Sequence, residues 1–253
     1  MRFAIFSDVH ANLEALEAVL ADARERNCTH FVCLGDVVGY NANPHECVER
    51  VRELDCPIVK GNHDEQATLV ESSSDFNPVA ERAIQWTRDH LAEEDRQWLQ
   101  DLPLQKQVRD FTIVHATLDT PSKWGYVFNN LDAAASFAYQ HTGVCFFGHT
   151  HVPMVFIRDD GDIKRERMEY VRIKPNTKYF INTVASANRA TETGARAIAF
   201  TTLKRTSSSS CASNTTWRRR KKKSLKLVCR DCSPSGLPLE DKVASTLPWP
   251  PKP

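Results

Sequence analysis

The sequence lacks the features that mark several large classes of protein. No apolar run in its 253 residues approaches the roughly 18 residues that a membrane-spanning helix needs. Lys+Arg 33 against Asp+Glu 32 leaves a net charge of +1, which excludes a globally basic nucleic-acid binder and an acidic disordered chain. The apolar opening Met1–Phe6 is broken at Ser7 and Asp8, too early for a signal peptide. We therefore expect a cytoplasmic protein with no membrane partner, whose eight cysteines are mostly reduced.

The first part of the chain predicts alternating strands and helices. Short apolar runs predict buried strands at Arg2–Ser7, His30–Leu34 and Cys56–Lys60. Between them, apolar residues at helical spacing follow the N-cap Asn12, and a proline opens a second helix at Pro44–Leu54. This β-α-β-α-β order predicts a parallel sheet with crossover helices, and hence the α/β fold class.

Further along, helices give way to strands, and no internal repeat is present. Helices are predicted from Asn77-Pro78 through Trp86, over Glu93–Leu99 and over Asn130–His141. The predicted strands are Gln107–Asp110, Phe111–His115, Val144–Phe147, Met154–Arg158, Glu169–Ile173 and Lys178–Ile181.

Polar residues follow almost every predicted strand at its carboxyl end. The motifs are Asp8-Val9-His10, Gly35-Asp36-Val37-Val38-Gly39, Gly61-Asn62-His63-Asp64, His115 and Gly148-His149-Thr150-His151. His10, Asp36 and Asn62 follow one another at equal intervals, each suited to one strand-helix-strand crossover. Because ligands bind at the carboxyl edge of open α/β sheets, we expect these loops to converge on one crevice.

The residue types in these motifs indicate a metal site. Asp, His and one Asn offer hard oxygen and imidazole ligands, which suit Mn, Fe, Zn or Ni better than a thiolate-binding ion. They are too many for one tetrahedral ion, whereas two ions that share a bridging carboxylate would use them all. Two-metal sites hold their ions about 3.5–4 Å apart and clamp phosphoryl oxygens.

Taken together and in this order, the five motifs resemble the signature of the calcineurin-like metallophosphoesterases. The opening Ser7–Leu13 is most similar to the small bacterial YfcE-like or diadenosine-tetraphosphatase-like branch. The resemblance covers roughly residues 1–182 and implies a four-layer α-β-β-α sandwich of two mixed sheets. Two departures, Ala11 for glycine and Ala116-Thr117-Leu118 for Gly-Thr/Ser-Pro, remove no ligand and bear on substrate preference alone.

The resemblance also implies a role for each motif residue. It assigns Asp8, His10 and His151 to a first metal ion, and Asp36 to the bridge between two ions. It assigns Asn62, His115 and His149 to the second ion. His63 would face the substrate phosphate and assist the leaving group, with Asp64 orienting it.

The implied activity is hydrolysis of a phosphomonoester or phosphodiester by a metal-bound hydroxide at a binuclear site. Two divalent ions are expected as cofactors, with Mn²⁺ favoured and Fe, Zn or Ni as alternatives, and a small phosphorylated compound such as a nucleotide as substrate. A non-catalytic scaffold of the same fold is one alternative, although every expected ligand and His63 are present. Trp124 and Tyr126, which follow His115, either wall the pocket or pack in the core. Cys28, Cys33, Cys47 and Cys56 are expected to act as small buried hydrophobic residues.

The composition changes beyond Leu203. Four serines, Ser207–Ser210, precede the basic run Arg218–Lys223 and a proline-rich ending. We expect a metallophosphoesterase domain over residues 1–182, extending to about 203, and a disordered tail over 204–253. A nucleic-acid-binding role for the basic run is the second alternative, but the tail has no RNP-like aromatic pattern and no zinc framework, since Cys229-x-x-Cys232 is a lone pair.

We hypothesise that the chain after Asn182 is translated out of frame, the alternative being a genuine low-complexity tail. The resemblance implies Asn-x-Gly-Ser and then Gln-Pro-Arg-Asp-Gly at this point, where Thr183–Glu192 stands instead. Permitted codons for Thr183–Glu192, read from their third base, yield Gly-Ser and then Gln-Pro-Arg-Asp-Gly, and Asn214–Arg218 yields Tyr-Asp-Val-Glu. Resequencing the locus should reveal the shift. One intact frame across this region, with this tail in the native protein's mass spectrum, would contradict the hypothesis.

Overall fold

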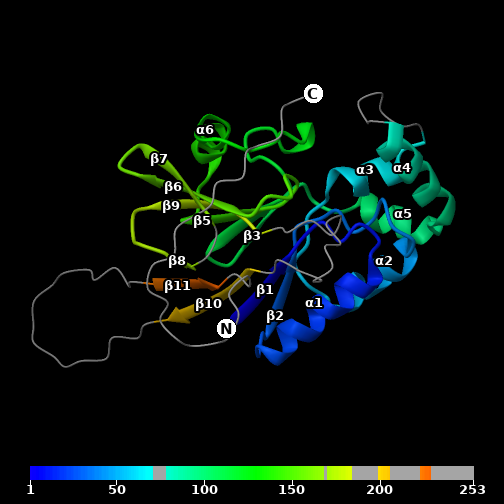
Figure 1. Cartoon of the computed structure of the whole chain (residues 1–253), viewed down its shortest axis with the longest axis horizontal. Helices are drawn as coiled ribbons and strands as arrows, with labels where there is room; N and C mark the ends of the chain where they lie inside the picture. Colours follow the sequence, from blue (N-terminus) through cyan, green and yellow to red (C-terminus); the bar gives the residue numbers. More distant parts are fainter. Residues whose placement is uncertain (71–77, 168–169, 184–198, 206–222, 229–253) are drawn as a thin grey trace, which may run out of the picture.

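In a computed structural model, the chain forms two β-sheets that pack face to face between two layers of helices (Figure 1). The structure describes residues 1–70, 78–167, 170–183, 199–205 and 223–228. No helix within these ranges is long and apolar enough to cross a membrane.

The first sheet is built on the two apolar runs nearest the N-terminus. These strands pair in parallel, with Phe3 opposite His30 and Phe6 opposite Cys33. The remaining strands join antiparallel, so the sheet is mixed. In spatial order the strands are β2 (His30–Cys33), β1 (Arg2–Phe6), β10 (Ala199–Arg205), β11 (Lys223–Val228) and β8 (Tyr170–Arg172).

The second sheet is also mixed, with three parallel strands at its centre. In spatial order its strands are β3 (Gln105–Val108), β4 (Phe111–Val114), β5 (Val144–Phe147), β9 (Lys178–Asn182), β6 (Met154–Asp159) and β7 (Asp162–Arg167). β6 and β7 form a hairpin that turns at Asp160 and Gly161, whose φ angles of 45° and 97° fit a tight two-residue turn.

The helices of the described chain are α1 (Leu13–Glu25), α2 (Pro44–Glu53), α3 (Asn62–Thr68), α4 (Pro78–His90), α5 (Glu93–Gln100) and α6 (Asn130–Tyr139), with a 3-10 turn η1 (Pro121–Lys123). α1 and α2 cover the outer face of the first sheet and α6 that of the second, while α3, α4 and α5 pack around α2 at one end (Figure 1). The predicted N-cap of α1 is confirmed, because the Asn12 side chain accepts a hydrogen bond from the Ala15 N–H at 2.9 Å. The predicted cap Asn77 lies outside the described residues.

Three apolar clusters hold the layers together. Between the sheets, Phe111 packs edge-on against Phe3 of the first sheet and Phe146 of the second, with ring centroids 5.5 and 5.3 Å apart. A second cluster joins the first sheet to α1 and α2, and a third joins the second sheet to α6 through Phe137 and Phe180. The four-layer α-β-β-α sandwich of two mixed sheets is therefore confirmed.

The strand predicted over Cys56–Lys60 is wrong. Ile58 makes an isolated bridge to Cys33, but Pro57 has no N–H to donate and the chain turns at Gly61 into α3. The sequence patterns also do not predict α3 or β7. α3 has no apolar repeat to indicate it, whereas the Asp160-Gly161 pair before β7 was an available hairpin signal.

Two described strands lie in the C-terminal region, where the sequence predicts the end of the domain and a disordered tail. β10 ends in the stretch where the tail was expected to begin, and β11 lies within residues 204–253, where a disordered tail and no strand were expected. The apolar residues of Ser224-Leu225-Lys226-Leu227 alternate with polar ones, which is typical of a strand. Several features of the C-terminal region lie outside the described residues. They are the stretch after Thr183 where the frame is hypothesised to shift, the serine run, most of the basic run and Cys229-x-x-Cys232.

The cysteine predictions are met in part. Cys33 and Cys47 are buried, whereas Cys28 and Cys56 are only half-buried. The five cysteines in the described ranges are free thiols, and burial raises the pKa of Cys47 and of Cys56 to about 12. These thiols therefore stay protonated and pack as apolar groups.

Candidate metal centre

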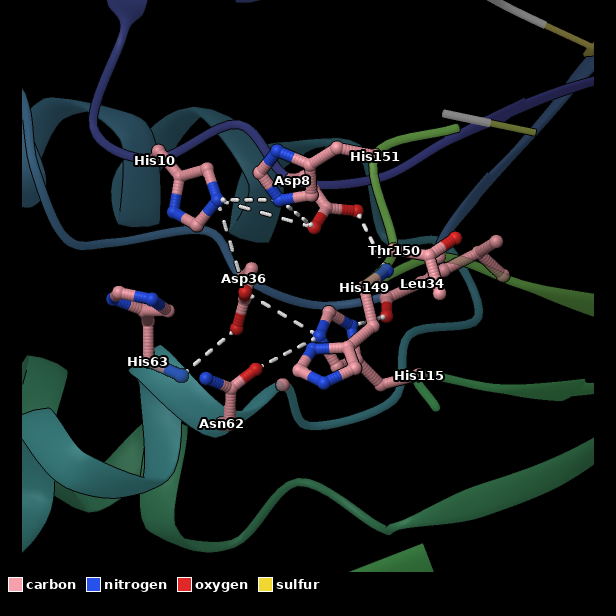
Figure 2. Close-up of polar contacts among 12 residues, drawn as sticks. Asp8, His10, Leu34, Asp36, Asn62, His63, His115, His149, Thr150 and His151 are labelled. Atoms are coloured by element: carbon pink, nitrogen blue, oxygen red, sulfur yellow. Dashed lines mark hydrogen bonds and ion pairs between the residues drawn. The ribbon is translucent and has the colours of Figure 1, made fainter. Parts of the chain in front are cut away.

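The polar motifs of both sheets meet beyond the carboxyl ends of four strands (Figure 2). They contribute Asp8 and His10 after β1, Asp36 after β2, Asn62 and His63 at the start of α3, His115 after β4, and His149 and His151 after β5. The structure thus places every ligand expected from the sequence around one point.

A strained backbone directs these side chains inward. The left-handed residues among them are Asp8 (φ 54°), His10 (50°), Asp36 (53°), His149 (65°) and His151 (54°). Such conformations are unfavourable for residues with a Cβ and cluster at functional sites. Two glycines allow the close approach, since a Cβ at Gly61 would collide with the Asp36 carboxylate and one at Gly148 would lie 2.7 Å from Asp8 Oδ2.

The first group of donors consists of Asp8, His10 and His151. His151 Nε2 lies 2.9 Å and His10 Nε2 lies 3.9 Å from Asp8 Oδ1. The two imidazole nitrogens also face each other at 3.3 Å. With His151 Nε2 deprotonated, the three atoms could hold one cation between them.

The second group consists of Asp36, Asn62, His115 and His149. His115 Nε2 lies 3.3 Å from Asp36 Oδ2 and 3.1 Å from Asn62 Oδ1. Donor atoms of Asp36, His115 and His149 all lie within 4.8 Å of one another. The same Asp36 Oδ2 is 3.8 Å from His10 Nε2, so this carboxylate adjoins both groups (Figure 2).

The imidazoles are oriented as metal ligands usually are. A metal-binding histidine typically uses its second nitrogen in a hydrogen bond to a carboxylate or backbone carbonyl. Three rings follow this rule: His10 Nδ1 with Val38 O at 3.3 Å, His115 Nδ1 with Leu34 O at 2.7 Å, and His149 Nε2 with Trp124 O at 2.8 Å. In each ring the other nitrogen is left for a cation, so the donor set fits a divalent metal.

Both carboxylates of the centre are ionised at neutral pH. Burial opposes ionisation of Asp8, but the hydrogen bond from His151 and the nearby histidines outweigh it and lower the pKa of Asp8 to about 2. The pKa of Asp36 is held well below its usual value for the same reason, chiefly by His115 and His63. Conversely, burial disfavours the His115 imidazolium, but the Asp36 charge raises the pKa of His115 to about 9. The centre therefore attracts positive charge.

His63 lies beside the donors on the first turn of α3. Its backbone N–H donates to Asp36 Oδ1 at 2.9 Å, and its ring lies 4.8 Å from His10 and 4.6 Å from Tyr40 between centroids. Burial lowers the pKa of His63 to about 3, so the ring is neutral at pH 7. A neutral imidazole can donate one hydrogen bond and accept another.

Asp64 has a use that the sequence did not indicate. Its Oδ2 accepts from the backbone N–H groups of Asp36 (2.8 Å) and Gly61 (3.0 Å), and its Oδ1 from those of Val37 (2.8 Å) and Val38 (3.2 Å). Burial and the charge of Asp36 raise the pKa of Asp64 to about 6. The Asp64 carboxylate therefore joins two segments, the loop that contains Asp36 and the start of α3. The orientation of the His63 ring by Asp64 remains a prediction.

Several supporting groups were not found from the sequence. The Trp124 carbonyl orients His149, and the buried Asn182 side chain donates to Gly148 O at 2.8 Å and to Thr150. Tyr126, for which pocket wall and core packing were both considered, is 58% exposed, so it is no core residue. No motif marks these positions, because their roles depend on contacts between distant segments.

We expect Mn²⁺ to stabilise the folded chain. Binding at 100 times the dissociation constant adds about 2.7 kcal/mol to the free energy of unfolding. Asp36→Asn removes a charge adjoining both donor groups and should strongly reduce the Mn²⁺-dependent rise in melting temperature and the bound metal. His141→Gln, an exposed histidine outside the centre, is the control. An Asp36→Asn protein with undiminished metal content would refute this expectation.

Asp64→Asn should destabilise the fold. The amide nitrogen would face backbone N–H donors that the carboxylate oxygens now accept, and each buried group left unpaired costs about 1–3 kcal/mol. Urea unfolding measures the change. Asp132→Asn is a matched control, because Asp132 caps α6 in the same way but is only half-buried. An equal decrease in the free energy of unfolding in the two variants would show that burial of the Asp64 hydrogen bonds adds nothing to stability.

Known proteins similar to this chain include metallophosphoesterases, as the donor set of the centre leads one to expect. Residues 1–174 match the family model described as calcineurin-like phosphoesterase superfamily domain. The uncharacterized protein MJ0912 of Methanocaldococcus jannaschii is 37% identical over 183 residues, which cover 71% of this chain and 73% of that protein. The crystal structure of a metallophosphoesterase from Sphaerobacter thermophilus is similar with 35% identity and a TM-score of 0.66, over 90% of this chain and 87% of that one.

A more distant structure shares the fold alone. The hypothetical protein PH1004 from Pyrococcus horikoshii OT3 is 14% identical, with a TM-score of 0.57 over 73% of this chain and 76% of that one. The family match spans the motifs from Asp8 to His151 that form the centre. The chain therefore belongs to the calcineurin-like phosphoesterase superfamily of metal-dependent hydrolases.

Proposed function

We propose that this protein hydrolyses small phosphomonoesters or phosphodiesters at a binuclear metal centre. Asp8, His10 and His151 would hold one ion, Asn62, His115 and His149 the other, and Asp36 would bridge them. The observation that carries this proposal is the position of Asp36, whose Oδ2 lies 3.8 Å from His10 Nε2 and 3.3 Å from His115 Nε2.

The donor set supports hard divalent ions. All seven donors are oxygen or imidazole nitrogen, which favours Mn²⁺, with Fe, Zn or Ni as alternatives. When bound, such ions neutralise charge on phosphoryl oxygens and lower the pKa of water toward neutrality. We also propose a cytoplasmic location, as the sequence predicts.

The chain's own groups would position the substrate phosphate and move the proton. His63 is the one imidazole of the cluster that lies outside the two proposed ligand sets, and its neutral ring can donate a hydrogen bond to the leaving oxygen. The hydrogen bond from the His63 backbone N–H to Asp36 Oδ1 holds His63 next to the proposed bridging carboxylate. The Asp64 network fixes the backbone of both residues and so supports their spacing.

Hydrolysis of bis-p-nitrophenyl phosphate tests the proposal. We expect Mn²⁺-dependent release of p-nitrophenolate that EDTA abolishes. His63→Ala should lower kcat by about 10²- to 10⁴-fold, the usual contribution of acid–base catalysis, while elemental analysis finds the same metal content. His141→Gln should match the wild type in both measurements.

Two outcomes would count against the proposal. Metal binding without hydrolysis of any mono- or diester would favour a non-catalytic scaffold with this fold. Full activity in the presence of EDTA would show that the hydrolysis does not use the centre.

A further inference from the structure

Two exposed aromatic rings stand beside the metal centre. Tyr126 is 58% exposed and Phe128 is 45% exposed, whereas Val127 between them is fully buried. The rings of Tyr126 and Phe128 contact each other and therefore lie on the same side of the segment, whereas Val127 packs in the apolar cluster with α6. We call Tyr126 and Phe128 the ring platform.

The ring platform continues directly from a proposed metal ligand. The Tyr126 ring stacks on the His149 imidazole with centroids 4.2 Å apart and planes 23° apart. Phe128 is nearly parallel to Tyr126, with centroids 5.6 Å and planes 5° apart. Flat rings thus extend from His149 toward the solvent.

Hydrogen bonds to the flanking residues hold the segment in place. The Trp124 carbonyl bonds to His149, and the Trp124 indole N–H donates to Glu65 Oε2 at 2.9 Å. The Phe128 N–H donates to Asp132 Oδ2 at 2.9 Å, and Arg165 Nη1 donates to the Phe128 carbonyl at 2.7 Å. Because the platform is fixed before a ligand arrives, little ordering entropy would be lost on binding.

We propose that the ring platform stacks the base of a nucleotide whose phosphate lies at the metal centre, so that nucleoside phosphoesters are the preferred substrates. This inference rests on the proposed phosphoesterase function. A nucleobase is a flat ring of matching size, and aromatic side chains bind any base through its face. Phosphorylated alcohols have no flat π face, and a sugar offers only C–H groups, so both would gain less than a base from two parallel exposed rings.

A third aromatic ring near the centre, that of Tyr40, is less accessible than the ring platform. Tyr40 is half-buried and contacts His63 and His10, with centroids 4.6 and 5.0 Å apart. Within the described ranges, the exposed aromatic side chains next to the donors are Tyr126 and Phe128. The organic part of a substrate would therefore find its best contact on the Tyr126 side.

Inhibition by two ligands that differ only in the base tests the inference. AMP and ribose 5-phosphate are compared as inhibitors of Mn²⁺-dependent bis-p-nitrophenyl phosphate hydrolysis. For the wild type we expect AMP to have the lower inhibition constant, by roughly 5- to 150-fold, as base stacking on an aromatic side chain implies. The ratio of the two constants is the readout, because any change in metal affinity affects both ligands alike.

Variants assign the effect to the rings. Tyr126→Leu and Phe128→Leu should bring the ratio toward one, whereas Tyr126→Phe should keep it. Tyr139→Leu, which removes an equally exposed tyrosine of α6 outside the platform, should leave the ratio unchanged. Melting temperatures identify any variant that fails to fold.

The outcomes separate the inference from the function on which it rests. Equal inhibition by AMP and ribose 5-phosphate in an active wild type, or a ratio unaffected by Tyr126→Leu and Phe128→Leu, would overturn the ring platform alone. Absence of Mn²⁺-dependent hydrolysis in the wild type would overturn the proposed function and the inference with it.

Discussion

The buried charge of Asp8 and Asp36 is the constraint around which the rest of the site is arranged. An ionised carboxylate in a protein interior costs several kcal/mol unless partners compensate it. His151 lies 2.9 Å from Asp8, and His115 lies 3.3 Å from Asp36, so each charge has an imidazole beside it. A divalent cation compensates such charges more strongly than an imidazolium does. The arrangement that makes this burial tolerable is therefore also the one that binds metal.

The fold supplies the geometry that this charge cluster needs. The apolar core between the sheets aligns β1 and β2 with β4 and β5, so that the ends of all four strands lie at one edge. Gly61 and Gly148 remove the side chains that would keep the loops apart. Asp64 then ties the loop after β2 to α3 through four backbone N–H groups. Core packing sets the distance between the sheets, and hydrogen bonds set the positions of the donors.

The segment Trp124–Phe128 makes different contacts on its two sides. Its carbonyl at Trp124 orients His149 toward the donors, while the rings of Tyr126 and Phe128 lie in solvent. Val127 lies between Trp124 and Phe128 and holds the segment in place by packing in the apolar cluster with α6. Phe128 stacks on Tyr126, one ring further from His149, so a change at this outer ring disturbs the donors less than a change at Tyr126.

Local patterns in the sequence predict the fold class, most helices and strands, and the residues that meet at the centre. Apolar periodicity and caps such as Asn12 act within a few residues of one another, so they are visible locally. Other local signals failed: Pro57 interrupts the strand expected over Cys56–Lys60, and α3 has no apolar repeat. The shared position of Asp36, the Asp64 network and the exposure of Tyr126 were decided only by tertiary structure. These features depend on contacts such as that of His115 with the Leu34 carbonyl, which join segments far apart in the chain, and no local pattern records which distant backbone group a side chain will meet.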